Sequence, residues 1–118
     1  MTANFGIYLH VPFCSHRCDY CASATWTDRD HLIEPYLRAC KKQAQMISSE
    51  VPQITSVFVG GGTPNLVPAT ELMAIFEDLP LATNVEFTVE CNPDRVTKEQ
   101  MRIYFQSGVT RISMGVQS

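Results

Sequence analysis

Residues 55–64 read TSVFVGGGTP, and this stretch decides the fold. Its first half is a short run of β-branched and aromatic residues, which is typical of a strand. Its second half is a glycine run closed by Thr63 and Pro64, a composition that suits neither a helix nor a strand. A strand that opens into a glycine loop indicates a place where another group approaches the backbone closely, because glycine has no side chain in the way.

Helices are predicted on both sides of this strand. Before it, apolar residues recur at spacings of four and three, and Pro35 suits the first turn of the helix that they imply. These residues are Ile33, Leu37, Cys40, Ala44 and Ile47. After the strand, Pro68 begins a second helix and Pro80 ends it. The apolar side of this second helix consists of Leu72, Ile75, Phe76 and Leu79.

A third helix is predicted from a capping-box pattern, in which Thr97 is followed three residues later by Gln100. Gly108 fits the C-terminal cap of this helix, because glycine readily adopts the left-handed conformation needed there. Its inward residues would be Met101, Tyr104 and Phe105.

Three further strands are predicted over residues 7–11, 85–90 and 111–117, where apolar and polar residues alternate. Strands that alternate with helices at this spacing indicate an α/β fold with a parallel sheet and its helices outside. A chain that stops on a fourth strand would leave an unpaired edge, so we expect a truncated piece of a larger barrel.

The polar faces of these strands predict a ligand site. In a parallel barrel the outward strand face packs on helices and is apolar, which assigns the other face to the interior. That interior set is Tyr8, His10, Glu86, Thr88, Glu90, Ser113 and Gln117. Carboxylates and amides are costly to bury without partners, so we expect the interior to hold a polar ligand. Glu90 and Gln117 lie at carboxyl strand ends, where barrels place their active sites.

Three of the five cysteines, Cys14, Cys18 and Cys21, are spaced C-x3-C-x2-C after the first strand. Three thiolates leave the fourth iron of a 4Fe-4S cubane free to bind an exchangeable molecule. The same cysteines with His16 could instead form a structural zinc site. The glycine loop and the polar strand ends favour the cluster, since a zinc knuckle needs neither.

Composition and charge indicate which partners and which cellular location to expect. The chain has 9 Lys and Arg against 12 Asp and Glu, which argues against a nucleic-acid partner. The N-terminal segment has no basic region, and its apolar run stops at Pro12. Neither a secretory signal nor a membrane span is therefore expected. We therefore expect a cytoplasmic protein whose odd number of cysteines serves as metal ligands and buried thiols.

The cysteine motif, with Tyr20 before its last cysteine, resembles that of the radical S-adenosylmethionine (SAM) superfamily. In that superfamily the amino and carboxylate groups of SAM chelate the open iron, and the reduced cluster passes one electron to the sulfonium. The resemblance implies that Cys14, Cys18 and Cys21 bind a 4Fe-4S cluster, that SAM binds beside it, and that a reducing electron donor is a partner.

Four motifs in order narrow this resemblance: residues 7–14 (IYLHVPFC), 60–64 (GGGTP), 90–93 (ECNP) and 111–118 (RISMGVQS). Together they are similar to those of the oxygen-independent coproporphyrinogen III oxidase family, which includes the HemW branch of haem chaperones. The resemblance covers essentially the whole chain. It implies that residues 1–118 are the N-terminal part of a radical SAM (βα) barrel, truncated after its fourth strand.

The resemblance also implies which residues contact SAM. Matching positions are Tyr8, Tyr20, Gly62, Thr63, Glu90 and Gln117. Backbone amides of Gly60, Gly61 and Gly62 would meet the methionine end of SAM, because no side chain obstructs them. The alternative role of Thr63 is a hydroxyl that stabilises the turn. No catalytic residue is assigned.

Position 23 separates the two branches of this family. The oxidase carries a further cysteine there, two positions beyond the cluster motif, whereas this chain has Ser23. The short segment before the first strand also matches the haem chaperones, although their usual residue at this position is phenylalanine. The chaperone branch implies haem and a haem-acceptor protein as partners. Two alternatives stay open: an oxidase that decarboxylates coproporphyrinogen III, and a structural zinc module.

Overall fold

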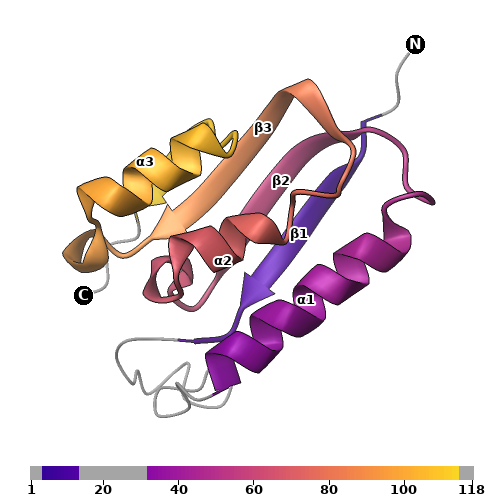
Figure 1. The fold of residues 1–118 in the computed structure, drawn as a ribbon. Helices are drawn as coiled ribbons and strands as arrows, with labels where there is room; N and C mark the ends of the chain where they lie inside the picture. Colours follow the sequence, from indigo (N-terminus) through magenta and orange to yellow (C-terminus); the bar gives the residue numbers. More distant parts are fainter. Residues whose placement is uncertain (1–3, 14–31, 115–118) are drawn as a thin grey trace.

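The computed structural model describes residues 4–13 and 32–114, which form a sheet covered by helices (Figure 1). The four strands are β1 (Gly6–Val11), β2 (Ile54–Gly61), β3 (Leu81–Cys91) and β4 (Arg111–Met114). They lie in the order β1-β2-β3-β4, and each neighbouring pair is parallel. The predicted α/β class with a parallel sheet is therefore confirmed.

Three α-helices follow the first three strands: α1 (Ile33–Ile47), α2 (Ala69–Ala74) and α3 (Lys98–Gln106). All three lie against the same face of the sheet in Figure 1, as right-handed crossovers require. Two short 3-10 helices, η2 (Pro64–Leu66) and η3 (Pro93–Arg95), follow the carboxyl ends of β2 and β3. None of the described helices is long and apolar enough to cross a bilayer.

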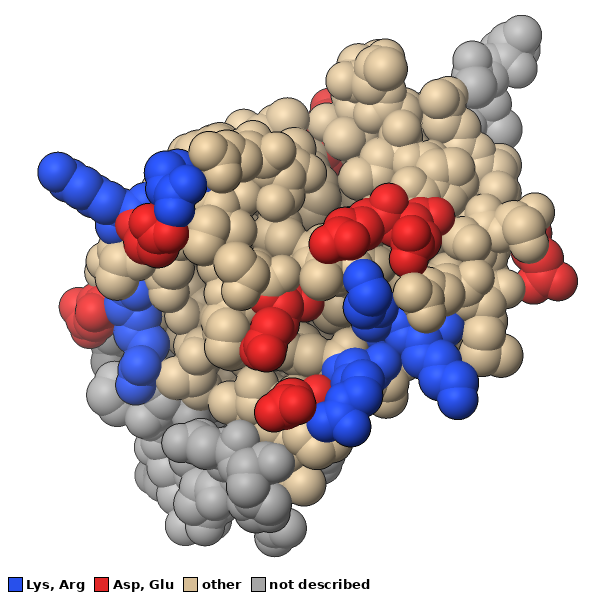
Figure 2. Space-filling model, in the orientation of Figure 1, with Lys and Arg blue, Asp and Glu red and all other residues tan. Residues whose placement is uncertain are grey.

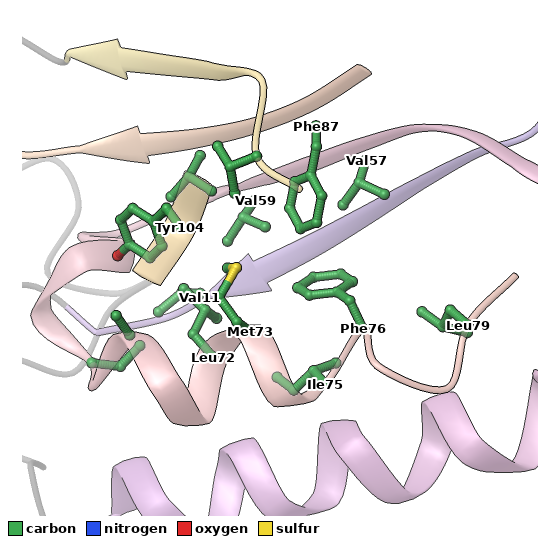
Figure 3. Packing of buried hydrophobic residues seen from close by; sticks show 14 of the residues in the cluster. Val11, Val57, Val59, Leu72, Met73, Ile75, Phe76, Leu79, Phe87 and Tyr104 are labelled. Carbon is green, nitrogen blue, oxygen red and sulfur yellow. The ribbon is translucent and has the colours of Figure 1, made fainter. Parts of the chain in front are cut away.

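The core lies between this helical layer and the sheet (Figure 3). The apolar side chains of β2 and β3 that face the helices are Val57, Val59, Phe87 and Val89, each at most 2% exposed. Phe76 packs its ring edge against Phe87, with the ring centroids 4.9 Å apart. The strand alternation read from the sequence therefore identified the helix-facing side correctly.

The second helix is shorter than predicted. It ends at Ala74, and the chain continues in tight turns, in which Ile75, Phe76 and Glu77 donate to carbonyls three residues back. The four predicted apolar residues are nevertheless all buried, because the tight turns keep them facing the sheet. Strands β2 and β3, in contrast, are longer than predicted. They extend beyond the predicted ranges 55–59 and 85–90 at both ends.

The inward face of α3 is narrower than predicted. Tyr104 is fully buried and Met101 partly buried, but Phe105 is 55% exposed, so its predicted inward position was wrong. Successive helical residues are rotated by about 100°, so a helix at the margin of the sheet that buries Tyr104 turns Phe105 away. Gly108 has φ of +109° just after this helix, which confirms its predicted place at the C-terminal cap.

The predicted capping box is present at the start of α3. The Thr97 hydroxyl accepts from the Gln100 backbone N–H at 3.0 Å, and the Gln100 side-chain oxygen accepts from the Thr97 N–H at 3.2 Å. Thr97→Ala is expected to destabilise this end of α3 by about 1 kcal/mol, since one N–H loses its acceptor. Hydrogen exchange of residues 98–101 in the full-length protein should accelerate by roughly fivefold. Thr70→Ala, at an exposed position of α2, should leave this exchange unchanged.

Basic and acidic side chains are interspersed on the helical face (Figure 2). Some are paired there, as Arg38 with Glu34 at 3.2 Å and Lys41 with Glu77 at 3.8 Å. The Arg38 pair is largely exposed and contributes little to stability, whereas the Lys41 side chain is partly buried. The view shows one face of the molecule, so the expectation that nucleic acid is not a partner stays a prediction.

Candidate functional site

Four residues from four strands form one row across the sheet near its carboxyl edge. In the register of the sheet, His10 lies beside Gly60, and Glu90 lies beside Ser113. Gly60 and Glu90 are neighbours too, because each follows the last paired residue of β2 and β3. We call His10, Gly60, Glu90 and Ser113 the edge row.

The edge row lies on the sheet face that no described helix covers. Side chains alternate along a strand, and the residues that precede Gly60 and Glu90 are fully buried on the helical side. The same alternation places most of the predicted interior set on the open face: Tyr8, His10, Glu86, Thr88, Glu90 and Ser113. Gln117, the last member of that set, is outside the described residues.

The glycines at the end of β2 make room beside Glu90. A Cβ atom on Gly60 would lie 2.5 Å from the Glu90 Oε1 atom and 2.8 Å from the ring of Phe58. Gly61 has φ of +108°, and a Cβ there would lie 2.7 Å from the His10 Nδ1 atom. All three distances are shorter than a Cβ contact tolerates, so a side chain on Gly60 would displace Glu90 or Phe58. Gly61 needs glycine for its positive φ as well.

The Glu90 carboxylate faces this glycine backbone. Its Oε1 atom accepts a hydrogen bond from the Gly61 N–H at 3.3 Å, and the side chain is only partly buried. A hollow of about 100 Å³ lies between the glycine loop and the end of β3. It is lined by Gly61, Gly62, Thr63, Pro64, Glu90, Cys91 and Asn92. The hollow therefore has glycine backbone on one side and the Glu90 carboxylate on the other.

Three backbone amides of the glycine loop donate hydrogen bonds within the protein. The Gly62 N–H donates to the Val11 carbonyl at 2.7 Å, and the Thr63 N–H donates to the Phe13 carbonyl at 2.6 Å. The Gly61 N–H is bonded to Glu90 as well. The hollow beside the loop therefore gives a ligand space, but these three amides are not free to donate to it. Thr63 is 3% exposed, and its side chain makes no cap hydrogen bond to η2.

An aromatic pair lies one row deeper on the open face. Tyr8 stacks on Phe58 with ring centroids 6.0 Å apart and an interplanar angle of 16°. The Tyr8 hydroxyl also lies 3.2 Å from the His10 Nδ1 atom. Burial and the nearby Glu90 raise the pKa of Tyr8, so its phenol is neutral at physiological pH. The sequence analysis missed Phe58, although its place between Val57 and Val59 puts it on this face.

Helix α1 supports the end of β1 from the other side. The Tyr36 hydroxyl donates to the His10 carbonyl, and the Tyr36 ring packs edge-on against Phe13 at 5.6 Å. Phe13 is fully buried, and its carbonyl accepts from Thr63 as described above. The residue just before Cys14 is thus fixed beside the glycine loop.

Several predicted site residues fall outside the described part of the chain: Cys14, Cys18, Cys21, His16 and Tyr20. Within residues 4–13 and 32–114, no three His, Cys, Asp or Glu side chains are grouped so as to hold a metal. Cys91 follows Glu90 and lies on the helical side of the sheet, buried in the core, where burial raises the pKa of its thiol to about 11. Cys40 is half-buried on α1.

The site thus consists of the Glu90 side chain and a glycine loop, both at the C-terminal ends of parallel strands. The family model of the radical SAM superfamily matches residues 8–118, nearly the whole chain. The chain belongs to the radical SAM superfamily. Membership implies a 4Fe-4S cluster and SAM as cofactors.

Individual radical SAM relatives carry two different names. A haem chaperone HemW from Lactococcus lactis subsp. lactis (strain IL1403) is 38% identical over 115 residues, which are 94% of this chain and 30% of that protein. An oxygen-independent coproporphyrinogen III oxidase from Paracoccus denitrificans (strain Pd 1222) is 35% identical over 124 residues, covering 98% of this chain and 27% of that protein.

The fold also matches a solved radical SAM structure, coproporphyrinogen III oxidase (HemN) from Escherichia coli. The TM-score is 0.81 at 25% identity, over 95% of this chain and 27% of that chain. The chain therefore spans less than a third of the length of these relatives. The predicted superfamily and barrel fold are confirmed by these matches.

Proposed function

We propose that this chain is part of a radical SAM haem chaperone of the HemW type, which carries haem to an acceptor protein. Residues 1–118 would form the N-terminal part of its radical SAM core domain. Cys14, Cys18 and Cys21 would hold the 4Fe-4S cluster, and SAM would bind at the carboxyl edge of the sheet. A reducing electron donor and a cytoplasmic location are parts of the same proposal, supported by the use of cysteines as ligands.

The residues present fit both cofactors. Three cysteines at this spacing satisfy three irons of a cubane and leave the fourth for an exchangeable ligand. Gly60 has no side chain, so the Glu90 carboxylate can lie against the loop, where it is offered to an amine or a ribose hydroxyl. When bound, the cluster and SAM would supply one-electron reductive cleavage of the sulfonium, which is chemistry of the cofactors themselves.

The residues of this chain would bind and orient SAM. Glu90 is held by the Gly61 N–H at 3.3 Å, so its second oxygen can accept from a ligand. Tyr8 would line the same face as a neutral phenol, and Tyr20 and Gln117 would complete the contacts. The observation that carries this assignment is the Glu90 carboxylate, which lies where a side chain on Gly60 would displace it.

The haem-carrier role rests on position 23. Ser23 stands where the oxidase branch has a cysteine, which favours the chaperone branch. The second candidate function is oxygen-independent oxidation of coproporphyrinogen III, favoured by the 35% identity to the oxidase from Paracoccus denitrificans. A structural zinc module has no support from the relatives.

Two assays on the full-length protein with a reconstituted cluster test this proposal. Haem titration should show saturable binding, followed by transfer to an apo-haemoprotein. Incubation with coproporphyrinogen III, SAM and a reductant should yield no vinyl-containing porphyrin by mass spectrometry. The oxidase from Paracoccus denitrificans, run in parallel, is the positive control. Vinyl product from this protein, or failure to bind haem, would overturn the chaperone assignment.

A further inference from the structure

Asn65 joins the glycine loop to the end of β3 through its side chain. It lies in η2 and is 2% exposed. Its Oδ1 atom accepts from the Asn92 N–H at 2.8 Å, and its Nδ2 atom donates to the Asn92 carbonyl at 3.1 Å. One side-chain amide thus pairs with both polar groups of one residue, as a neighbouring strand would.

This pairing begins where the strand pairing stops. The register of β2 with β3 ends at Val59 and Val89, and the site residues Gly60 to Thr63 and Glu90 follow it. Asn65 comes two residues after Thr63, and Asn92 comes two residues after Glu90. The two hydrogen bonds of Asn65 therefore join the two chain segments that line the hollow.

A third hydrogen bond holds Asn65 from α3. The Gln100 Nε2 atom donates to the Asn65 carbonyl at 2.9 Å, while the Gln100 Oε1 atom accepts from the Thr97 N–H. The Asn92 Oδ1 atom in turn accepts from the Asp94 N–H at 2.9 Å and starts η3. Each of the two paired residues is thus held by a further hydrogen bond, Asn65 by Gln100 and Asn92 by Asp94.

We infer that Asn65 is a positioning residue for SAM, setting the distance between the glycine loop and Glu90. This inference rests on the proposed SAM site at the carboxyl edge. Without the amide, the partly buried N–H and carbonyl of Asn92 lose their partners, and the two strand ends are free to separate. The Gly61 N–H would then no longer hold the Glu90 carboxylate in its place.

Asn65→Asp in the full-length protein tests this, because its effect depends on pH. A carboxylate can accept from the Asn92 N–H but repels the Asn92 carbonyl, whereas a protonated carboxyl group can accept and donate as the amide does. At pH 8.5 we expect SAM affinity to fall by about tenfold. Burial and the facing Asn92 carbonyl should raise the pKa of the introduced carboxyl group. As the pH is lowered and this group is protonated, affinity should recover relative to wild type.

The readout is the change in the electron paramagnetic resonance (EPR) spectrum of the reduced cluster on SAM titration, with iron and sulfide content measured in parallel. Asn84→Asp makes the same chemical change at an exposed position of β3 and should leave affinity unchanged. Asn65→Ala removes both bonds without adding charge. It should lower affinity equally at all pH values, and it decides the question if the Asp variant fails to fold.

The outcomes separate this inference from the proposed function. If wild-type protein with an intact cluster does not respond to SAM, the SAM site itself is wrong. If the wild type responds and both Asn65 variants bind SAM with wild-type affinity, Asn65 has no positioning role. An Asp variant whose loss of affinity does not change with pH, or an equal loss in Asn84→Asp, would also overturn the inference.

Discussion

Replacing any one of Cys14, Cys18 and Cys21 by alanine in the full-length protein is expected to abolish the 4Fe-4S cluster. Two thiolates cannot hold three irons of a cubane, so iron and acid-labile sulfide should fall to background. SAM should then cause no spectroscopic change. Metal analysis after anaerobic purification and reconstitution measures this directly.

Cys40→Ala is the matched control for the cluster variants. Cys40 lies on α1, half-buried, and its side chain is predicted to serve packing alone. The variant should retain full iron and sulfide content. Cluster content that survives the loss of Cys14, Cys18 or Cys21, or stoichiometric zinc in the wild type, would contradict the cluster assignment.

Gly60→Ala is expected to weaken SAM binding by at least about tenfold while leaving the cluster in place. The new methyl carbon would lie 2.5 Å from the Glu90 Oε1 atom, so the carboxylate must move out of the space beside the loop. The affinity is measured by SAM titration of the reduced cluster, and the cluster by its iron content.

Gly108→Ala separates this steric effect from a general loss of stability. Gly108 also requires its glycine, because φ is +109°, but a Cβ there meets nothing within 4 Å. The substitution should lower stability by about 1 kcal/mol, as alanine at a positive φ does, and leave SAM affinity unchanged. Equal affinities of the Gly60→Ala and wild-type proteins would show that the hollow beside Glu90 is not the SAM site.

Alternation along the strands predicted the faces of the sheet well. It placed Tyr8 and Glu90 on the open face, because the two-residue period of a strand is fixed by backbone geometry. The capping box at Thr97 was equally predictable, since its two hydrogen bonds lie within four residues. Such features depend on local chain geometry alone.

Features that depend on the packing of distant segments were not predictable in this way. Periodicity gave no reason to expect Phe105 to be exposed, because the width of the buried stripe depends on how far α3 overlaps the sheet. Asn65 was missed because its partner, Asn92, lies 27 residues away. Likewise, the Gly61 and Gly62 amides were expected to meet a ligand, but the Glu90 carboxylate and the Val11 carbonyl accept from them.

The central claim is that three cysteines leave one iron open for SAM beside the Glu90 edge of this sheet. EPR spectroscopy of the full-length protein, reconstituted and reduced without air, tests it most directly. The account predicts a 4Fe-4S signal whose shape changes when SAM is added. A 4Fe-4S signal that SAM leaves unchanged, or no such signal at all, would contradict it.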